Sequence, residues 1–98
     1  MKAIKYEELL NEELKDEDFR REYEALEEEF TIAEEVIRLR TQQKLTQKEL
    51  AERTGTSQPA IARLESGNYK NLTLSFLRRV AKALNAVPEV HLRKQRGT

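Results

Sequence analysis

The stretch that decides the fold is TQKELAERTGTSQPAIARLESG, residues 46–67, where signals for two short helices lie on either side of a glycine. Thr46 and Glu49 have the spacing of a capping box, in which each side chain accepts a hydrogen bond from the other residue's backbone N–H. Gly55 has no Cβ and can adopt the positive φ that a tight turn requires. The stretch therefore predicts a helix that begins at Thr46 and is followed by a sharp turn at Gly55.

A second helix is predicted after the turn. Either Thr56 or Ser57 can cap its first N–H groups, and Gly67 can end it. Ile61 and Leu64 are three residues apart and so share one side of that helix, which we expect to face the core. The opposite side and the projecting N-terminus carry side chains with no role in the core, namely Ser57, Gln58, Pro59, Ala62 and Arg63.

Helix-turn-helix proteins use a helix with such an outer face, braced by a preceding helix, to read the major groove of DNA. Gln58 can pair with atoms N6 and N7 of adenine, and Arg63 suits guanine or a phosphate. Pro59 has no side-chain donor, so we expect apolar contact with a thymine methyl there. Gln47 can donate from the bracing helix to a phosphate. The predicted DNA-binding residues are Gln47, Thr56, Ser57, Gln58, Pro59, Ala62 and Arg63, with Lys70 and Asn71 from the following loop.

The pattern L-x-Q-x-E-L-A-x-x-x-G-x-S-Q-x-x-I-x-x-L-E-x-G, from Leu45 to Gly67, resembles the helix-turn-helix of the Xre group, which includes the lambdoid phage repressors. The resemblance implies that Gln47 contacts phosphate. It also implies a base-reading face formed by Ser57, Gln58, Pro59 and Arg63. The proline at position 59 departs from the polar residue common in that group, which leaves the bases that are read undetermined.

Length and composition limit the other possibilities. Ninety-eight residues suffice for one compact domain with an appendage, and the absence of cysteine excludes disulfides and thiolate catalysis. No apolar run approaches the roughly 20 residues that span a bilayer, so we expect a cytoplasmic protein without a membrane partner. Glutamate runs such as residues 27–29 lack a pocket that would raise a carboxyl pKa, and His91 alone cannot form a metal site. We therefore expect neither an enzyme nor a bound cofactor or metal.

The formal net charge of zero conceals two oppositely charged segments. Residues 1–30 hold 5 Lys or Arg against 12 Asp or Glu, whereas residues 31–98 hold 13 against 6, so the two segments carry −7 and +7. A segment of +7 can neutralise several phosphates, and its binding to DNA should weaken steeply with salt. The acidic segment should therefore point away from the DNA or be covered by something else.

The segment before the helix-turn-helix is predicted to be helical. A short helical pattern is formed by Ile4, Leu9, Leu10 and Leu14, and Asp16 can cap a second helix. In that second helix Phe19, Tyr23, Leu26 and Phe30 follow at helical spacing and form an apolar stripe on a charged rod.

Two further helices and a strand complete the prediction. Thr31 with Glu34 repeats the capping-box spacing, which predicts a new helix to about Gln43. Thr73 can cap the last helix, which covers the core. In residues 88–93, Val90 and Leu92 alternate with polar side chains, as in a short strand. A lone strand needs a partner, so we expect a homodimer in which two such strands pair.

The resulting prediction is an all-α protein: a five-helix, lambda-repressor-like helix-turn-helix domain over residues 31–86. An acidic helical arm, residues 1–30, precedes it, and a C-terminal strand and tail, residues 87–98, follow. The arm either packs on its own domain or docks on a basic partner, with Phe19, Tyr23, Leu26 and Phe30 as anchors and the carboxylates steering encounter.

The segment KDEDFRREYEALEEEFTIAEEVIRLRTQQKLTQKELAERTG, residues 15–55, resembles the start of HigA-type antitoxins, and the likeness covers roughly residues 5–85. The resemblance implies an antitoxin that neutralises a RelE- or HigB-like mRNA-cleaving toxin and represses its own operon as a dimer on a palindromic operator. Two alternatives remain open. One is a stand-alone phage-like repressor, and the other is a protein-interaction adaptor that does not bind DNA.

Overall fold

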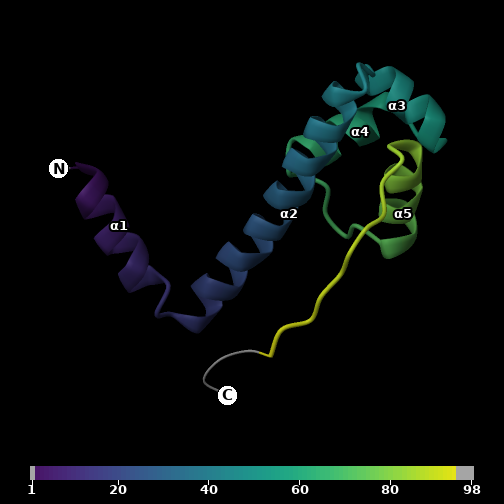
Figure 1. The fold of residues 1–98 in the computed structure, drawn as a ribbon. Helices are drawn as coiled ribbons and strands as arrows, with labels where there is room; N and C mark the ends of the chain where they lie inside the picture. Colours follow the sequence, from purple (N-terminus) through teal and green to yellow (C-terminus); the bar gives the residue numbers. More distant parts are fainter. Residues whose placement is uncertain (1, 95–98) are drawn as a thin grey trace.

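A computed structural model describes residues 2–94. This part of the chain contains five helices and no strand. Figure 1 shows that the second half of α2 gathers with α3, α4 and α5 into a compact body, while α1 and the first half of α2 extend away from it. The helices are α1 (Lys2–Glu13), α2 (Glu17–Gln42), α3 (Gln47–Thr54), α4 (Gln58–Glu65) and α5 (Leu74–Ala83).

The core of the body is formed by apolar side chains from each of the helices α2 to α5. Leu50 of α3, Ile61 of α4 and Val80 of α5 have no exposed surface, and Leu84, just after α5, is 2 % exposed. Removing such a side chain from water stabilises the fold by about 1.5–3 kcal/mol. Because α3 packs on both α4 and α5, and α2 packs on α4, these contacts fix the direction of α4 relative to α3.

The predicted helix-turn-helix is confirmed in detail. The Thr46 and Glu49 side chains accept hydrogen bonds from each other's backbone N–H at 3.0 and 2.8 Å, so the capping box is complete. The bond from the Thr46 N–H, followed by that from its hydroxyl, holds the pKa of Glu49 below its ordinary value of 4.5. Gly55 has φ +80°, and Ser57, rather than Thr56, caps α4 by accepting from the N–H of Ala60.

The prediction that a new helix begins at Thr31 is wrong. Asp16 caps α2 as expected, accepting from the N–H of Phe19 at 3.0 Å, but the helix then continues for 26 residues to Gln42. An N-cap needs an extended backbone, and Thr31 lies instead within a run of strong helix formers, EALEEE before it and AEE after it. Each residue that continues the helix adds one backbone hydrogen bond, whereas ending the helix and starting another would lose some of these bonds and require a second, unfavourable nucleation.

The prediction of a C-terminal strand is also wrong. Residues 86–94 form neither helix nor strand, and Val90 and Leu92 are 61 % and 99 % exposed. A strand needs a neighbour to share its backbone hydrogen bonds, and no element described in this chain offers one. Residues 95–98 of the predicted tail lie outside the described part.

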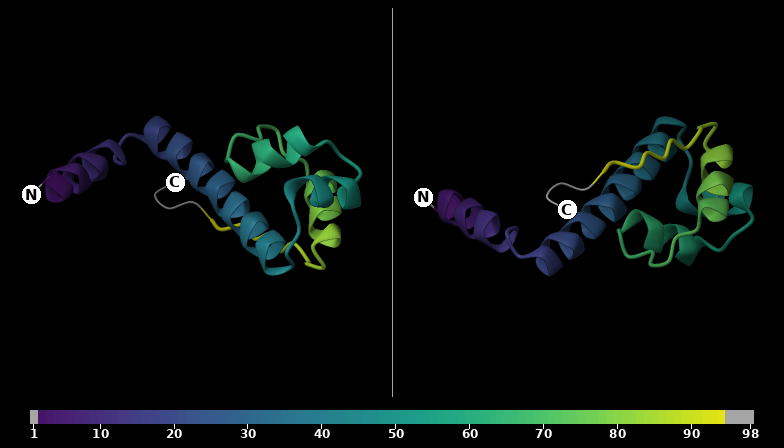
Figure 2. Two further views of the ribbon diagram at one scale, coloured as in Figure 1. Left: turned by 90° about the horizontal axis from the view of Figure 1, so that it is seen from above. Right: turned by 90° about the horizontal axis from the view of Figure 1, so that it is seen from below.

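The helix count of the domain also differs from the prediction. Four helices, α2 to α5, build the body, and the fifth, α1, stands apart from it in every view (Figures 1 and 2). A bend at residues 14–16 separates α1 from α2. None of the helices in residues 2–94 is long and apolar enough to cross a membrane.

Candidate nucleic-acid interface

The exposed face of α4 has the composition that the sequence predicted. Ser57, Gln58, Pro59 and Arg63 are exposed and Ala62 is half-buried. The inner face is closed, because Ala60, Ile61 and Leu64 are all buried. The polar side of α4 is therefore a surface of the molecule and is available to a partner.

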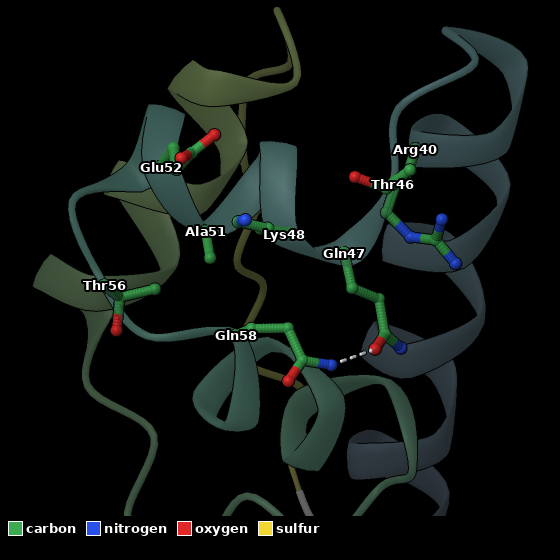
Figure 3. Close-up of a pocket in the computed structure, with 8 residues that line it drawn as sticks. All are labelled: Arg40, Thr46, Gln47, Lys48, Ala51, Glu52, Thr56 and Gln58. Carbon is green, nitrogen blue, oxygen red and sulfur yellow. Dashed lines mark hydrogen bonds between the residues drawn. The ribbon is translucent and has the colours of Figure 1, made fainter.

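Gln47 and Gln58, predicted to touch phosphate and base, are brought together across the turn. The Gln58 amide donates to Gln47 Oε1 at 2.8 Å (Figure 3). The Gln47 amide in turn donates to Glu65 Oε1 at 3.0 Å. A carboxylate only accepts, so Glu65 obliges Gln47 to turn its NH₂ inward and its carbonyl toward Gln58. The amide of Gln58 keeps one N–H and its carbonyl oxygen for a ligand, and these are the two groups that pair with adenine.

Arg40 begins this chain of hydrogen bonds, and its role was not predicted from the sequence. Its Nε and Nη2 donate to the two carboxylate oxygens of Glu65 at 2.5 and 3.0 Å, and its Nη1 donates to the carbonyl of Leu45 at 2.7 Å. The two side chains are 16 % and 5 % exposed, so the pair is screened little by solvent. No local pattern identifies a partner 25 residues away.

An open hollow of about 740 Å³ lies between the starts of α3 and α4 (Figure 3). Helix N-termini carry partial positive charge and attract anions such as phosphate. Thr56, one of the predicted residues, lines this hollow, and the exposed ammonium of Lys48 adds a cation that the sequence analysis did not single out. The carboxylate of Glu52, on the same wall, works against an anion. The full lining is Arg40, Thr46, Gln47, Lys48, Ala51, Glu52, Thr56 and Gln58.

Lys70 and Asn71 lie in the loop between α4 and α5, and both are exposed. Asn71 has φ +58°, a left-handed conformation that asparagine tolerates better than most residues. The loop approaches α4 through Tyr69, whose ring lies 5.7 Å from the guanidinium carbon of Arg63. Among the side chains that the structure describes, in residues 8–94, no group of three or more histidine or acidic residues could hold a metal ion.

The short α3, the left-handed turn and the polar-faced α4 define a helix-turn-helix protein of the DNA-binding class. Comparison with known families agrees, since the family HTH_3, described as helix-turn-helix, matches residues 36–97, more than half of the chain. The chain belongs to this family of Xre-like, DNA-binding transcription regulators, which are typically not enzymes. Neither the curated proteins nor the solved structures give a significant match.

Proposed function

We propose that this regulator is the antitoxin of a toxin–antitoxin pair. In this proposal the arm binds a RelE- or HigB-like mRNA-cleaving toxin, and the outer face of α4 binds a palindromic operator and represses the operon. The observation that carries the toxin-binding half is the apolar stripe of α2, in which the side chains of Leu26 and Phe30 are about half exposed.

The apolar stripe has the spacing of a helix face that can dock in a groove of a partner protein. The rings of Phe19 and Tyr23 stack with centroids 6.2 Å apart, and farther along α2 the side chains of Leu26 and Phe30 are 50 % and 51 % exposed. Apolar anchors at helical spacing on one helix face are the usual means by which a helix fills a partner's groove. The net charge of −7 over residues 1–30 favours a basic partner and disfavours nucleic acid.

The DNA-binding half rests on the outer face of α4 and the amides that Glu65 orients. Reading a palindrome needs two copies of α4 about one DNA turn apart. A homodimer would supply the two copies, and the exposed side chains of Val90 and Leu92 are the apolar surface of the C-terminal segment that its interface would cover.

One observation favours the stand-alone repressor. The ring of Phe30 lies against Gly67 at the end of α4, so one of the four proposed anchors already contacts the body. Tyr23 and Leu26 precede Phe30 on α2 by one to two helix turns, and substituting them leaves the Phe30 contact with the body intact.

The experiment compares the Tyr23→Ala/Leu26→Ala double variant with wild type. The probes are the purified product of the neighbouring reading frame and the operator upstream of the pair. We expect toxin affinity to fall at least 30-fold, because two central anchors of about 1–2 kcal/mol each are lost. Operator affinity should stay within twofold.

Leu74→Ala is the matched control, since Leu74 of α5 is equally exposed, at 54 %, but lies outside the stripe. It should leave both affinities unchanged. A double variant that still rescues growth from the toxin would contradict the toxin-docking proposal and leave the stand-alone repressor.

A further inference from the structure

Arg63, the base- or phosphate-contacting arginine proposed on α4, lies at one end of a row of stacked side chains. Its Cζ is 5.7 Å from the ring centroid of Tyr69. The Tyr69 ring stacks on that of Phe76, with centroids 5.0 Å apart and 13° between the planes. Cζ of Arg79 lies 5.6 Å from the centroid of Phe76. A series of ring contacts thus runs from Arg63 through Tyr69 and Phe76 to Arg79.

The far end of this row is anchored. Arg79 Nη2 donates to the carbonyls of Thr54 and Gly55 at 3.1 and 2.9 Å, at the end of α3. Phe76 is part of the core and is only 9 % exposed. Tyr69 is therefore a half-buried platform whose position is set by the core, although it belongs to the loop after α4.

We propose that Tyr69 is a positioning residue for DNA recognition, whose ring holds the guanidinium of Arg63 ready to contact a base or phosphate. A cation over a ring face is attracted by the ring's quadrupole. The N–H groups of a planar guanidinium point outward along its edges, so contact with a ring leaves donors for a bidentate bond. An arginine held in this way loses less conformational freedom on binding than a freely rotating one.

This inference rests on the DNA-binding half of the proposed function. It adds a residue that no part of the helix-turn-helix pattern contains, because Tyr69 lies two residues after Gly67. It also accounts for the exposed guanidinium of Arg63, which makes no hydrogen bond or ion pair with the side chains described in residues 8–94 but has a defined neighbour in Tyr69.

The test is a double-mutant cycle on the full chain. The probe is the duplex that wild type enriches from a DNA library with a randomised core. We expect Tyr69→Leu to weaken binding about 3- to 10-fold, the range of a partly exposed cation–π contact, and to broaden base preference at one position of each half-site. Tyr69→Phe keeps the ring and should bind within twofold of wild type.

In an Arg63→Ala background, Tyr69→Leu should change affinity less than twofold, because the guanidinium that the ring positions is gone. An equal loss in both backgrounds would overturn the inference and leave Tyr69 a packing residue of the loop. A wild-type chain that enriches no duplex would instead overturn the DNA-binding proposal, and this inference with it.

Tyr69→Leu also removes packing on Phe76, so a second series keeps the test decisive if that variant melts below the assay temperature. Position 69 is replaced by phenylalanine with increasing numbers of ring fluorines, which weakens the quadrupole stepwise while nearly preserving shape. Affinity should fall with each fluorine. A flat series in folded proteins would overturn the inference.

Discussion

The helix-turn-helix body and the arm are both helical, but different forces hold their helices. In the body, α3 and α4 have eight residues each, whereas isolated helices below about 12–15 residues are marginal in water. Core contacts through Leu50 and Ile61 hold them in place. The first half of α2 depends on local terms, such as the Asp16 cap and the Arg21–Asp18 ion pair at 2.8 Å. The body therefore buries its apolar side chains in folding, whereas the arm leaves those of Leu26 and Phe30 about half exposed.

The largest expected effect is on the free energy of unfolding, which a substitution in the body should lower much more than one in the arm. Ile61→Ala removes a side chain with no exposed surface and should destabilise the body by about 2–5 kcal/mol, with the higher values for a site that cannot collapse. Leu26→Ala, its counterpart in the arm, should change stability by about 0.5 kcal/mol or less. Chemical denaturation measures both, and similar losses would show that the arm is part of the cooperative core.

A somewhat smaller loss is expected from the ion pair that links α2 to α4. Arg40→Met leaves the carboxylate of Glu65, 5 % exposed, without its charged partner, and should cost about 3 kcal/mol. Operator affinity should also fall, because Glu65 orients Gln47 and through it Gln58.

The double variant Arg40→Met/Glu65→Met is the matched control for this pair. It removes both charges and should recover much of the stability but not the operator affinity. If it recovers the affinity as well, the hydrogen-bonded chain does not orient the amides for DNA.

The boundary between arm and body is tested at Gly67. A Cβ there would lie 2.7 Å from Cδ1 of Phe30, at a backbone φ of +78°. Gly67→Ala should therefore cost about 1–3 kcal/mol, partly from the left-handed conformation and partly from the clash. In a Phe30→Ala background the clash disappears and the cost should drop to about 1–2 kcal/mol. Equal costs in the two backgrounds would mean that Phe30 does not rest on the body.

The smallest effect concerns pH and the capping box of α3. The pKa of Glu49 is lowered in the folded state, so its contribution to stability is fully present above about pH 4.5 and is lost as pH falls through the lowered pKa. Thermal melting of wild type and Glu49→Gln should therefore differ most near neutral pH and converge once the pH falls below the lowered pKa. A constant difference at all pH values would contradict this assignment. Because Glu49 is exposed, the shift in melting temperature should be small.

Local signals allowed the helix-turn-helix to be predicted closely. The Thr46–Glu49 box, the turn at Gly55 and the caps Ser57 and Thr73 each act within four residues, and all appear in the structure. The same reasoning failed at Thr31, because a capping-box spacing says nothing about how strongly the surrounding residues favour helix. It failed again at residues 88–93, where alternation can describe a strand but cannot supply its neighbour.

The residues of the candidate site likewise fall into those that the sequence predicted and those that it did not. The exposed face of α4 could be predicted because helical periodicity separates it from Ile61 and Leu64. Arg40 and Tyr69 could not, because each acts on a residue of another element, and nothing within one helix turn of either indicates its partner.

The sequence by itself therefore determined the helix starts, the turn and the outward face of α4, because hydrogen bonds between near neighbours and the 3.6-residue repeat govern these features. Only the tertiary structure decided that α2 runs unbroken from the arm into the core, that Arg40 meets Glu65 and that Tyr69 stands beside Arg63. Those features depend on the packing of α2, α3, α4 and α5 around one core, and packing joins residues that no local pattern connects.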